Sequence, residues 1–111
     1  MIKMKKNEDL KTRPSQKAMT ELENLYKSNQ FDYLEDKVRK LIENYPRVSI
    51  LYNILGIAYR KQEKVNEAKQ VFLDALKINP NSYSLMTNLG SVYKHLNNFS
   101  KSEEMYLKAL K

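Results

Sequence analysis

The chain has 111 residues and a formal net charge of +7, and its length suits one small domain. Hydrophobic residues make up 41% and charged residues 30%, proportions typical of a folded globular protein. The absence of cysteine excludes disulfides, thiolate chemistry and cysteine-based zinc sites. The sequence has no apolar run of membrane-spanning length and no signal-peptide core at its start, so we expect a cytoplasmic location.

Residues 1–14 are expected to form a flexible basic arm. Residues 1–17 contain six Lys or Arg side chains and two acidic ones, whereas the rest of the chain carries 14 basic and 11 acidic side chains. The rest of the protein is therefore nearly balanced in charge. A basic arm can contact phosphate groups, but a solvated terminus is the simpler interpretation.

The remainder of the chain predicts helices only. Tyr52, Leu55 and Tyr59 are spaced to share one face of a helix. Pro80 ends a later helix because proline cannot continue the hydrogen-bond ladder, and Ser82 offers a fresh N-cap. Period-2 alternation and hairpin-turn dipeptides, the signals of strands, are missing. Six helices are expected, at about 16–28, 31–44, 48–61, 65–78, 82–95 and 99–111.

The helical pattern repeats along the chain. The segments "YNILGIAY" (52–59) and "MTNLGSVY" (86–93) align when the sequence is shifted by one fixed length, and in the same frame Pro46 aligns with Pro80. A period of about 20–50 residues is typical of repeat architectures. Gly56 and Gly90, the only glycines, recur at one position of a helix that glycine disfavours. We interpret both as packing residues that let a second helix approach closely, not as phosphate-binding residues.

This pattern resembles the tetratricopeptide repeat, whose period is about 34 residues and whose signature places an aromatic residue, Leu-Gly, Tyr, Ala, Phe and Pro at fixed spacings. The middle repeat fills these places with Tyr52, Leu55, Gly56, Tyr59, Ala68, Phe72 and Pro80. The third repeat matches at Leu89, Gly90, Tyr93, Tyr106 and Ala109 and departs at Met86 and Ser102. The first repeat is degenerate, with Glu21 and Leu22 in the Leu-Gly places, so its first helix is expected to be offset or tilted.

The resemblance implies an all-α fold, a right-handed α-solenoid of antiparallel helix pairs known as the tetratricopeptide superhelix. It covers residues 15–111, with repeats at about 15–48, 49–82 and 83–111, the last one truncated.

The sequence contains no recognisable catalytic constellation. His95 is the only histidine, no metal-ligand spacing surrounds it, and no serine lies in a nucleophile elbow. We therefore predict a protein that is not an enzyme and that uses no cofactor and no metal. The tyrosines lie in the predicted core or away from any lysine stripe, which disfavours nucleic acid as a partner. A membrane partner is not expected either.

The resemblance implies that a peptide or protein segment binds in a concave groove lined by the first helix of each repeat. Helical geometry places eleven residues on this face: Ile50, Asn53, Ile54, Ile57, Arg60, Lys61, Ser84, Thr87, Asn88, Ser91 and Lys94. In the first repeat the face is expected to carry Met19, Glu23, Tyr26 and Lys27. Asn53 and Asn88 could bond the backbone of a bound peptide. Alternatively, the isoleucines simply pack against the neighbouring repeat.

The leading hypothesis is a non-catalytic protein-protein interaction module that binds an apolar and acidic segment. Related domains clamp acidic chaperone tails with basic and amide residues. The matching positions here are Met19, Glu23, Ile54, Ser84 and Asn88, of which only the last fits, so we reject that partner. The alternative is a docking or substrate-recognition array of a larger bacterial enzyme of the glycosyltransferase or sulfotransferase type. Phe99, Tyr106 and Leu110 on the last helix predict weak self-association.

Overall fold

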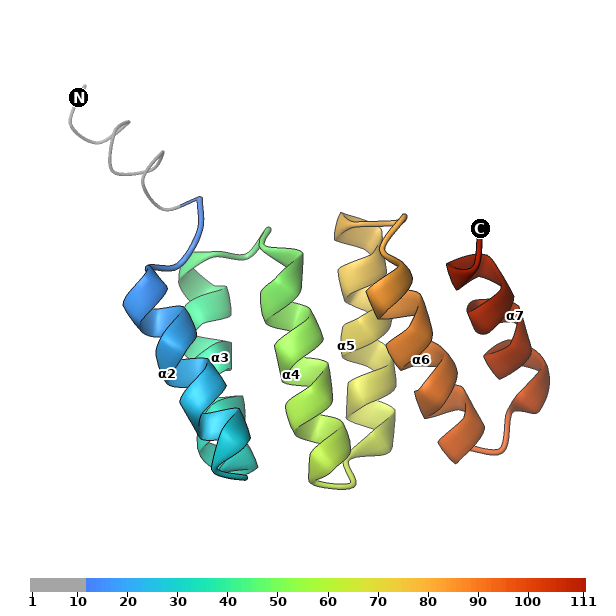
Figure 1. The fold of residues 1–111 in the computed structure, drawn as a ribbon, viewed down its shortest axis with the longest axis horizontal. Helices are drawn as coiled ribbons and strands as arrows, with labels where there is room; N and C mark the ends of the chain where they lie inside the picture. The colour runs from blue at the N-terminus through green and yellow to red at the C-terminus, as the bar shows by residue number, and fades with distance from the viewer. Residues whose placement is uncertain (1–11) are drawn as a thin grey trace.

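The computed structural model describes residues 12–111 and folds them into six α-helices (Figure 1). They are α2 (Gln16–Lys27), α3 (Phe31–Asn44), α4 (Ser49–Lys61), α5 (Val65–Ile78), α6 (Tyr83–His95) and α7 (Phe99–Ala109). Every helix end lies within two residues of its predicted position. Ser82 caps α6 as expected, because its side chain accepts a hydrogen bond from the backbone N–H of Leu85 at 3.2 Å. Residues 1–11 of the predicted arm lie outside the described range.

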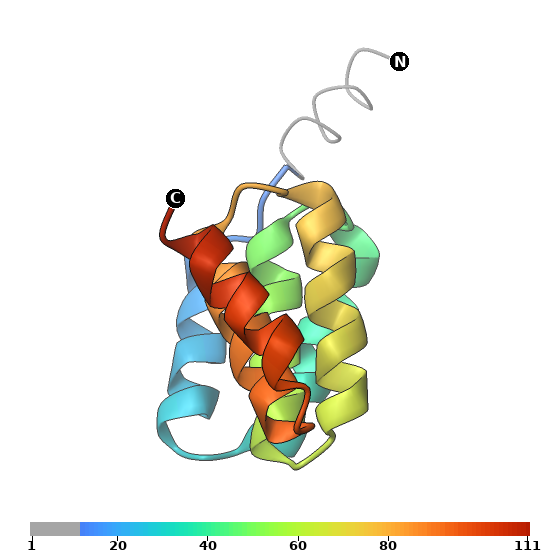
Figure 2. The same cartoon turned by 90° about the vertical axis from the view of Figure 1, so that its right-hand side faces the viewer.

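Consecutive helices run antiparallel and stack in chain order, so the three repeats are the pairs α2/α3, α4/α5 and α6/α7 (Figure 1). The first helices of the pairs, α2, α4 and α6, form one layer, and α3 and α5 lie behind it. The view along the stack separates α2 from α3 and α5 (Figure 2). We call the surface formed by α2, α4 and α6 the first-helix face.

The hydrophobic core consists of two clusters, one at each junction between repeats. The first contains Leu22, Leu34, Val38, Leu51, Leu55 and Ala58. The second contains Val65, Ala68, Phe72, Ala75, Leu85, Leu89, Val92 and Tyr93. Each cluster joins the second helix of one repeat to the first helix of the next. Stacking of neighbouring repeats therefore buries apolar side chains that a single helix pair would leave exposed.

Both glycines lie where an aromatic ring crosses the first helix of its own repeat. A Cβ atom on Gly56 would lie 2.8 Å from Cδ1 of Phe72 and closer still to the far edge of that ring. A Cβ atom on Gly90 would lie 2.9 Å from Cε1 of Tyr106. The predicted packing role of the glycines is thus confirmed. Ser102, at the place of Ala68, is tolerated because its buried hydroxyl donates to the carbonyl of Gly90 at 2.8 Å.

The position of Tyr106 corrects the predicted surface of the last helix. Its ring packs against Gly90 and is only partly exposed, so it does not belong to an outward-facing stripe. Phe99 and Leu110 are exposed as predicted, and Leu107 joins them in place of Tyr106.

The first repeat solves the same packing problem with different side chains. Leu22 stands one repeat length before Gly56, Val38 stands one repeat length before Phe72, and both are buried. A larger residue on the first helix is thus matched by a smaller one on the second. The α2/α3 pair is packed less closely than the other two pairs. The expected offset is not seen in the sequence register, because α2 shifted by one repeat length nearly coincides with α4 at both ends.

The turn inside each repeat contains one residue with a left-handed backbone. Asn29, Glu63 and Asn97 have φ values of 59°, 63° and 63°, and they occupy the same position of the three successive repeats. In each turn the next backbone N–H reaches back over the helix end, as Lys64 does to the carbonyl of Tyr59 at 2.8 Å. Because the turn is the same in all three repeats, the second helix of each repeat begins at the same position relative to the end of the first.

A polar cluster ties the first repeat to the second. Glu35 on α3 accepts hydrogen bonds from Gln62 at 2.9 Å and from Lys64 at 3.0 Å, both at the turn after α4. Arg39 lies 3.4 Å from its other oxygen. Although partial burial opposes ionisation, these donors and the charge of Lys64 hold the pKa of Glu35 below its ordinary value.

Candidate peptide-binding groove

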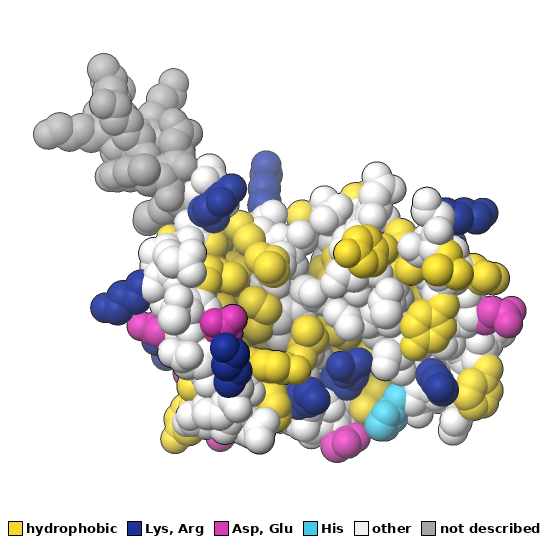
Figure 3. Space-filling model, in the orientation of Figure 1, with side chains coloured by type: hydrophobic (Ala, Val, Ile, Leu, Met, Phe, Trp, Pro, Cys, Tyr) yellow, Lys and Arg dark blue, Asp and Glu magenta, His cyan; other side chains and the backbone are white. Residues whose placement is uncertain are grey.

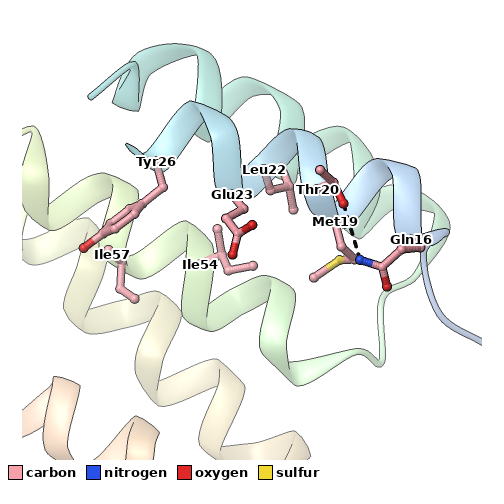
Figure 4. A pocket seen from close by; sticks show the side chains of 8 residues that line it. All are labelled: Gln16, Met19, Thr20, Leu22, Glu23, Tyr26, Ile54 and Ile57. Atoms are coloured by element: carbon pink, nitrogen blue, oxygen red, sulfur yellow. Dashed lines mark hydrogen bonds between the residues drawn. The ribbon is translucent and has the colours of Figure 1, made fainter. Parts of the chain in front are cut away.

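A groove runs along the first-helix face between α2 and α4. It has a volume of about 360 Å³ and opens to solvent (Figure 4). It is lined by Gln16, Met19, Thr20, Leu22, Glu23, Tyr26, Ile54 and Ile57. The space-filling view shows hydrophobic side chains gathered on this part of the surface (Figure 3). The groove lies where α2 and α4 face each other across the junction of the first two repeats.

Apolar side chains dominate the groove. Ile54 and Ile57 on α4 are only partly buried, and each also packs against one of the two core clusters. The alternative that these isoleucines pack against the neighbouring repeats is therefore correct for Ile54 and Ile57, and their role in binding stays a prediction. On the α2 side, Tyr26 is 44% exposed and meets the ring of Phe31 edge-on, with 5.8 Å between centroids. An apolar side chain of a ligand would find a preformed place here.

One carboxylate borders this apolar surface. The side chain of Glu23 extends from α2 toward Ile54 (Figure 4). It is 62% exposed and pairs loosely with Lys27 at 3.8 Å. A carboxylate at this place would repel an acidic group bound beside the apolar surface.

The junction between α4 and α6 is polar instead of apolar. Asn88 donates to the side-chain oxygen of Asn53 at 2.6 Å, and Asn53 donates to Ser84 at 3.4 Å. Closer to the C-terminal ends of α4 and α6, Arg60 donates to the hydroxyl of Ser91 at 3.0 Å. These groups therefore bridge two repeats. A peptide backbone could use only the hydrogen-bonding capacity that these bonds leave free.

The C-terminal ends of the three first helices carry basic side chains in their last turns. These are Lys27 on α2, Arg60 and Lys61 on α4, and Lys94 and His95 on α6. Lys and Arg side chains are visible along this edge of the first-helix face (Figure 3). Positive charge here also complements the helix dipoles, which gives it a structural role without any ligand. These basic side chains form a positively charged edge on the first-helix face, which we call the basic edge.

Individual basic residues differ in their surroundings. The ammonium group of Lys61 lies 5.9 Å from the ring centroid of Phe31, which directs it toward the first repeat. His95 lies 3.5 Å from Glu63, which belongs to the turn between α4 and α5. Lys94 is exposed, and among residues 12–111 it forms no ion pair.

Of the eleven predicted residues, only Ile54 and Ile57 line the groove between α2 and α4, and the other nine lie outside it. Ile50 is 51% exposed and lines a separate depression beside Arg13 and Pro14. Thr87 is exposed, and its hydroxyl donates to the carbonyl of Tyr83 within α6. The role of all eleven residues in binding remains a prediction.

Gln16, Thr20 and Leu22 line the groove but were not predicted. Leu22 occupies the place of a packing glycine and is buried in the first core cluster, and its edge also lines the groove. Its spacing from Met19 and Tyr26 would have revealed a shared helical face.

Residues 12–111 contain neither a cluster of metal ligands nor a helix suited to cross a membrane. No group of three or more metal-ligating His, Cys, Asp or Glu side chains was found there. None of the described helices is long and apolar enough to cross a membrane.

Comparison with known proteins identifies the repeat. Two models of the tetratricopeptide repeat match residues 49–82 and 71–104. Among curated proteins, the uncharacterized protein ycf37 of Pyropia yezoensis is 33% identical over 70 residues, or 63% of this chain. The ycf37 protein of Porphyra purpurea is 32% identical over 68 residues, or 61% of this chain. The matching segment spans only 39% of the length of each relative.

Solved structures show the same fold. The second tetratricopeptide domain of Spaghetti (RPAP3), bound to the HSP90 peptide SRMEEVD, superimposes with a TM-score of 0.83 at 15% identity, covering 95% of this chain and 96% of that one. MamA of Desulfovibrio magneticus RS-1 superimposes with a TM-score of 0.79 at 17% identity, covering 84% of this chain and 52% of that one. The family models, the repeat period and the paired helices agree, and this chain belongs to the tetratricopeptide repeat proteins.

Proposed function

We propose that this chain is a non-catalytic interaction module that binds an extended segment of another protein on its first-helix face. Tetratricopeptide domains generally mediate protein contacts, and the Spaghetti domain with the same fold was solved with a bound peptide. The observation that carries the proposal is the open apolar groove between α2 and α4. Its volume suits one or two apolar side chains of a ligand.

The charges around the groove define the ligand further. Arg60 and Lys94 lie at the C-terminal ends of α4 and α6, about one helical turn beyond Ile57. Glu23 borders the groove on the other helix. The ligand should therefore place an apolar side chain over Ile57 and an acidic group beyond it, toward the basic edge and away from α2.

This ligand differs from the acidic peptide seen in the Spaghetti complex. SRMEEVD ends in closely spaced acidic residues. In this chain Met19, Glu23 and Ile54 occupy the surface where such a tail would need cations. We expect that peptide to bind weakly or not at all.

Selection from a displayed library of random peptides tests the proposal without a known partner. The expected result is enrichment of peptides that combine an apolar residue with an acidic one, bound at least about tenfold more weakly by Ile57→Glu. Tyr33→Glu is the matched control, because Tyr33 is 63% exposed on α3 and lies outside the groove. Circular dichroism should show that both variants remain folded. Absence of enrichment, or equal binding by folded Ile57→Glu, would refute the groove as the site.

A further inference from the structure

Helix α7 exposes a stripe of apolar side chains. On α5, the equivalent helix of the middle repeat, the side chains at the same positions are covered by a neighbouring helix. Phe99, Leu107 and Leu110 are 61%, 54% and 83% exposed. The residues one repeat length earlier, on α5, are Val65, Leu73 and Leu76. Val65 is only 9% exposed, and both leucines pack against the cluster that α5 forms with α6.

The first repeat shows the same arrangement at two of the three positions. Phe31 and Ile42, which precede Phe99 and Leu110 by two repeat lengths, pack against the cluster shared by α3 and α4. The position of Leu107 is Arg39 in the first repeat, and its side chain is 61% exposed. The positions of Phe99 and Leu110 are thus covered in both earlier repeats by a helix that runs antiparallel to the one bearing them, and the position of Leu107 is covered only in the middle repeat. The internal repeat therefore indicates what kind of element fits α7, namely an antiparallel helix with an apolar face.

We propose that α7 of a second copy of this chain covers the stripe, in a symmetric antiparallel α7–α7 contact. The charges that flank the stripe favour this occupant. Glu104 precedes Leu107, whereas Lys108 and Lys111 follow it on the same flank of the helix. When two such helices pair about a two-fold axis at Leu107, each Glu104 faces the lysines of the other copy.

Glu104 and Lys108 already form an ion pair within α7, and the proposed contact would exchange this exposed pair for pairs between the two copies. Glu104 and Lys108 lie 3.3 Å apart within one helix, and their side chains are 54% and 56% exposed. The contact would be small, because α7 has 11 residues and three exposed large apolar side chains. Interfaces below about 1,200 Å² form weak, concentration-dependent complexes, so the dimer should dissociate on dilution.

Sedimentation velocity over a concentration series tests the proposal. The chain should pass from monomer to dimer without larger species, and Leu110→Glu should raise the dissociation constant about tenfold or more, because each contact would bury two unpaired carboxylates. Leu110 is the most exposed residue of the stripe, so this variant should keep its fold. Tyr33→Glu is the control at the opposite end of the stack. A strict monomer at every concentration would overturn the proposal. Growth into open-ended polymers would overturn it too if Tyr33→Glu weakened them. Such polymers would indicate that α7 of one copy contacts α3 of the next.

Charge reversal separates the contact from any effect on folding. Glu104→Lys should weaken the dimer, and adding Lys108→Glu to it should restore much of the affinity. In addition, Leu107→Cys introduces a single thiol into a chain without cysteine. Mild oxidation should join two copies of this variant but not of Tyr33→Cys. Equal crosslinking of both variants, or no rescue by the double reversal, would contradict the symmetric contact.

Discussion

The ring of Phe72 on α5 packs directly against Gly56 on α4, the first helix of the same repeat. The Phe72 ring is completely buried and occupies the space that a side chain at position 56 would need. We expect Gly56→Ala to lower the free energy of unfolding by about 1–2 kcal/mol, because overpacking outweighs the ~1 kcal/mol gained in helix propensity. Urea unfolding measures this. Gly90→Ala is the comparison and should be nearly neutral, since the Tyr106 ring is partly exposed and can move. Equal losses in the two variants would mean that the two rings are equally fixed.

The first repeat suggests how the middle repeat could be repacked. Leu22 and Val38 occupy the places of Gly56 and Phe72 and are both buried. We therefore expect Gly56→Leu and Phe72→Val each to destabilise the protein, by ~1–3 kcal/mol or more, and the double variant to recover part of the loss. Thermal melts of the three variants give the coupling energy. If the stability losses of the two single variants simply add in the double variant, a smaller side chain at position 72 does not make room for a larger one at position 56.

The repeat period predicted much of the fold because both junctions between repeats carry a proline, Pro46 and Pro80. Pro80 and the capping Ser82 define one junction, and the glycine positions identify which helices approach closely. Comparison of single positions could not show that Leu22 and Val38 compensate for each other, since that exchange depends on two residues on different helices. The loose packing of α2 was missed for this reason, although a groove on the first-helix face was predicted.

The candidate site was predicted less completely than the fold. Helical spacing placed Asn53 and Asn88 on the first-helix face, where the structure has them. Spacing along one helix cannot show that these side chains bond each other across 35 residues of chain. The residues of the basic edge were found because their position in the last helical turn follows directly from the helix ends.

Glu63 occupies a backbone conformation that suits asparagine better. Its φ of 63° equals that of Asn97, and the left-handed region costs most side chains ~1–2 kcal/mol but is less unfavourable for asparagine. We expect Glu63→Asn to raise the free energy of unfolding by ~0.5–1 kcal/mol. The lost pair with His95 is exposed and contributes little. Asn97→Glu is the reverse change and should destabilise the protein by a similar amount. Loss of stability in Glu63→Asn would indicate that the contact with His95 matters more than the backbone.

The cluster around Glu35 should make stability depend on pH. Because the folded protein holds the pKa of Glu35 below its ordinary value, the ionised carboxylate favours the folded state at neutral pH. That contribution is lost as the pH falls through the lowered pKa. The melting temperature of the wild type should therefore drop more steeply than that of Glu35→Gln between about pH 5 and about pH 3. Asp36→Asn, at a side chain that is 70% exposed, controls for the loss of one negative charge. Parallel curves for wild type and Glu35→Gln would show that the cluster does not favour the charged carboxylate.

The basic edge of the first-helix face should act mainly on the rate of association. Arg60 and Lys94 lie beyond the apolar groove, where they can attract an acidic ligand before the apolar contact forms. With a selected peptide that carries an acidic residue, we expect Arg60→Glu with Lys94→Glu to slow association about tenfold at low salt and to remove its decrease with added salt. Stopped-flow measurements at several salt concentrations give both quantities.

The matched control changes the same charge on the opposite layer of the protein. Lys40 on α3 and Lys77 on α5 have side chains that are 73% and 78% exposed, so Lys40→Glu with Lys77→Glu alters the net charge equally but far from the groove. Neither pair lies in the core clusters, although Arg60→Glu removes the bond to Ser91, and melting curves should confirm that both double variants are folded. If both slow association to the same extent, the effect comes from net charge alone. The basic edge would then have no specific part in recognition.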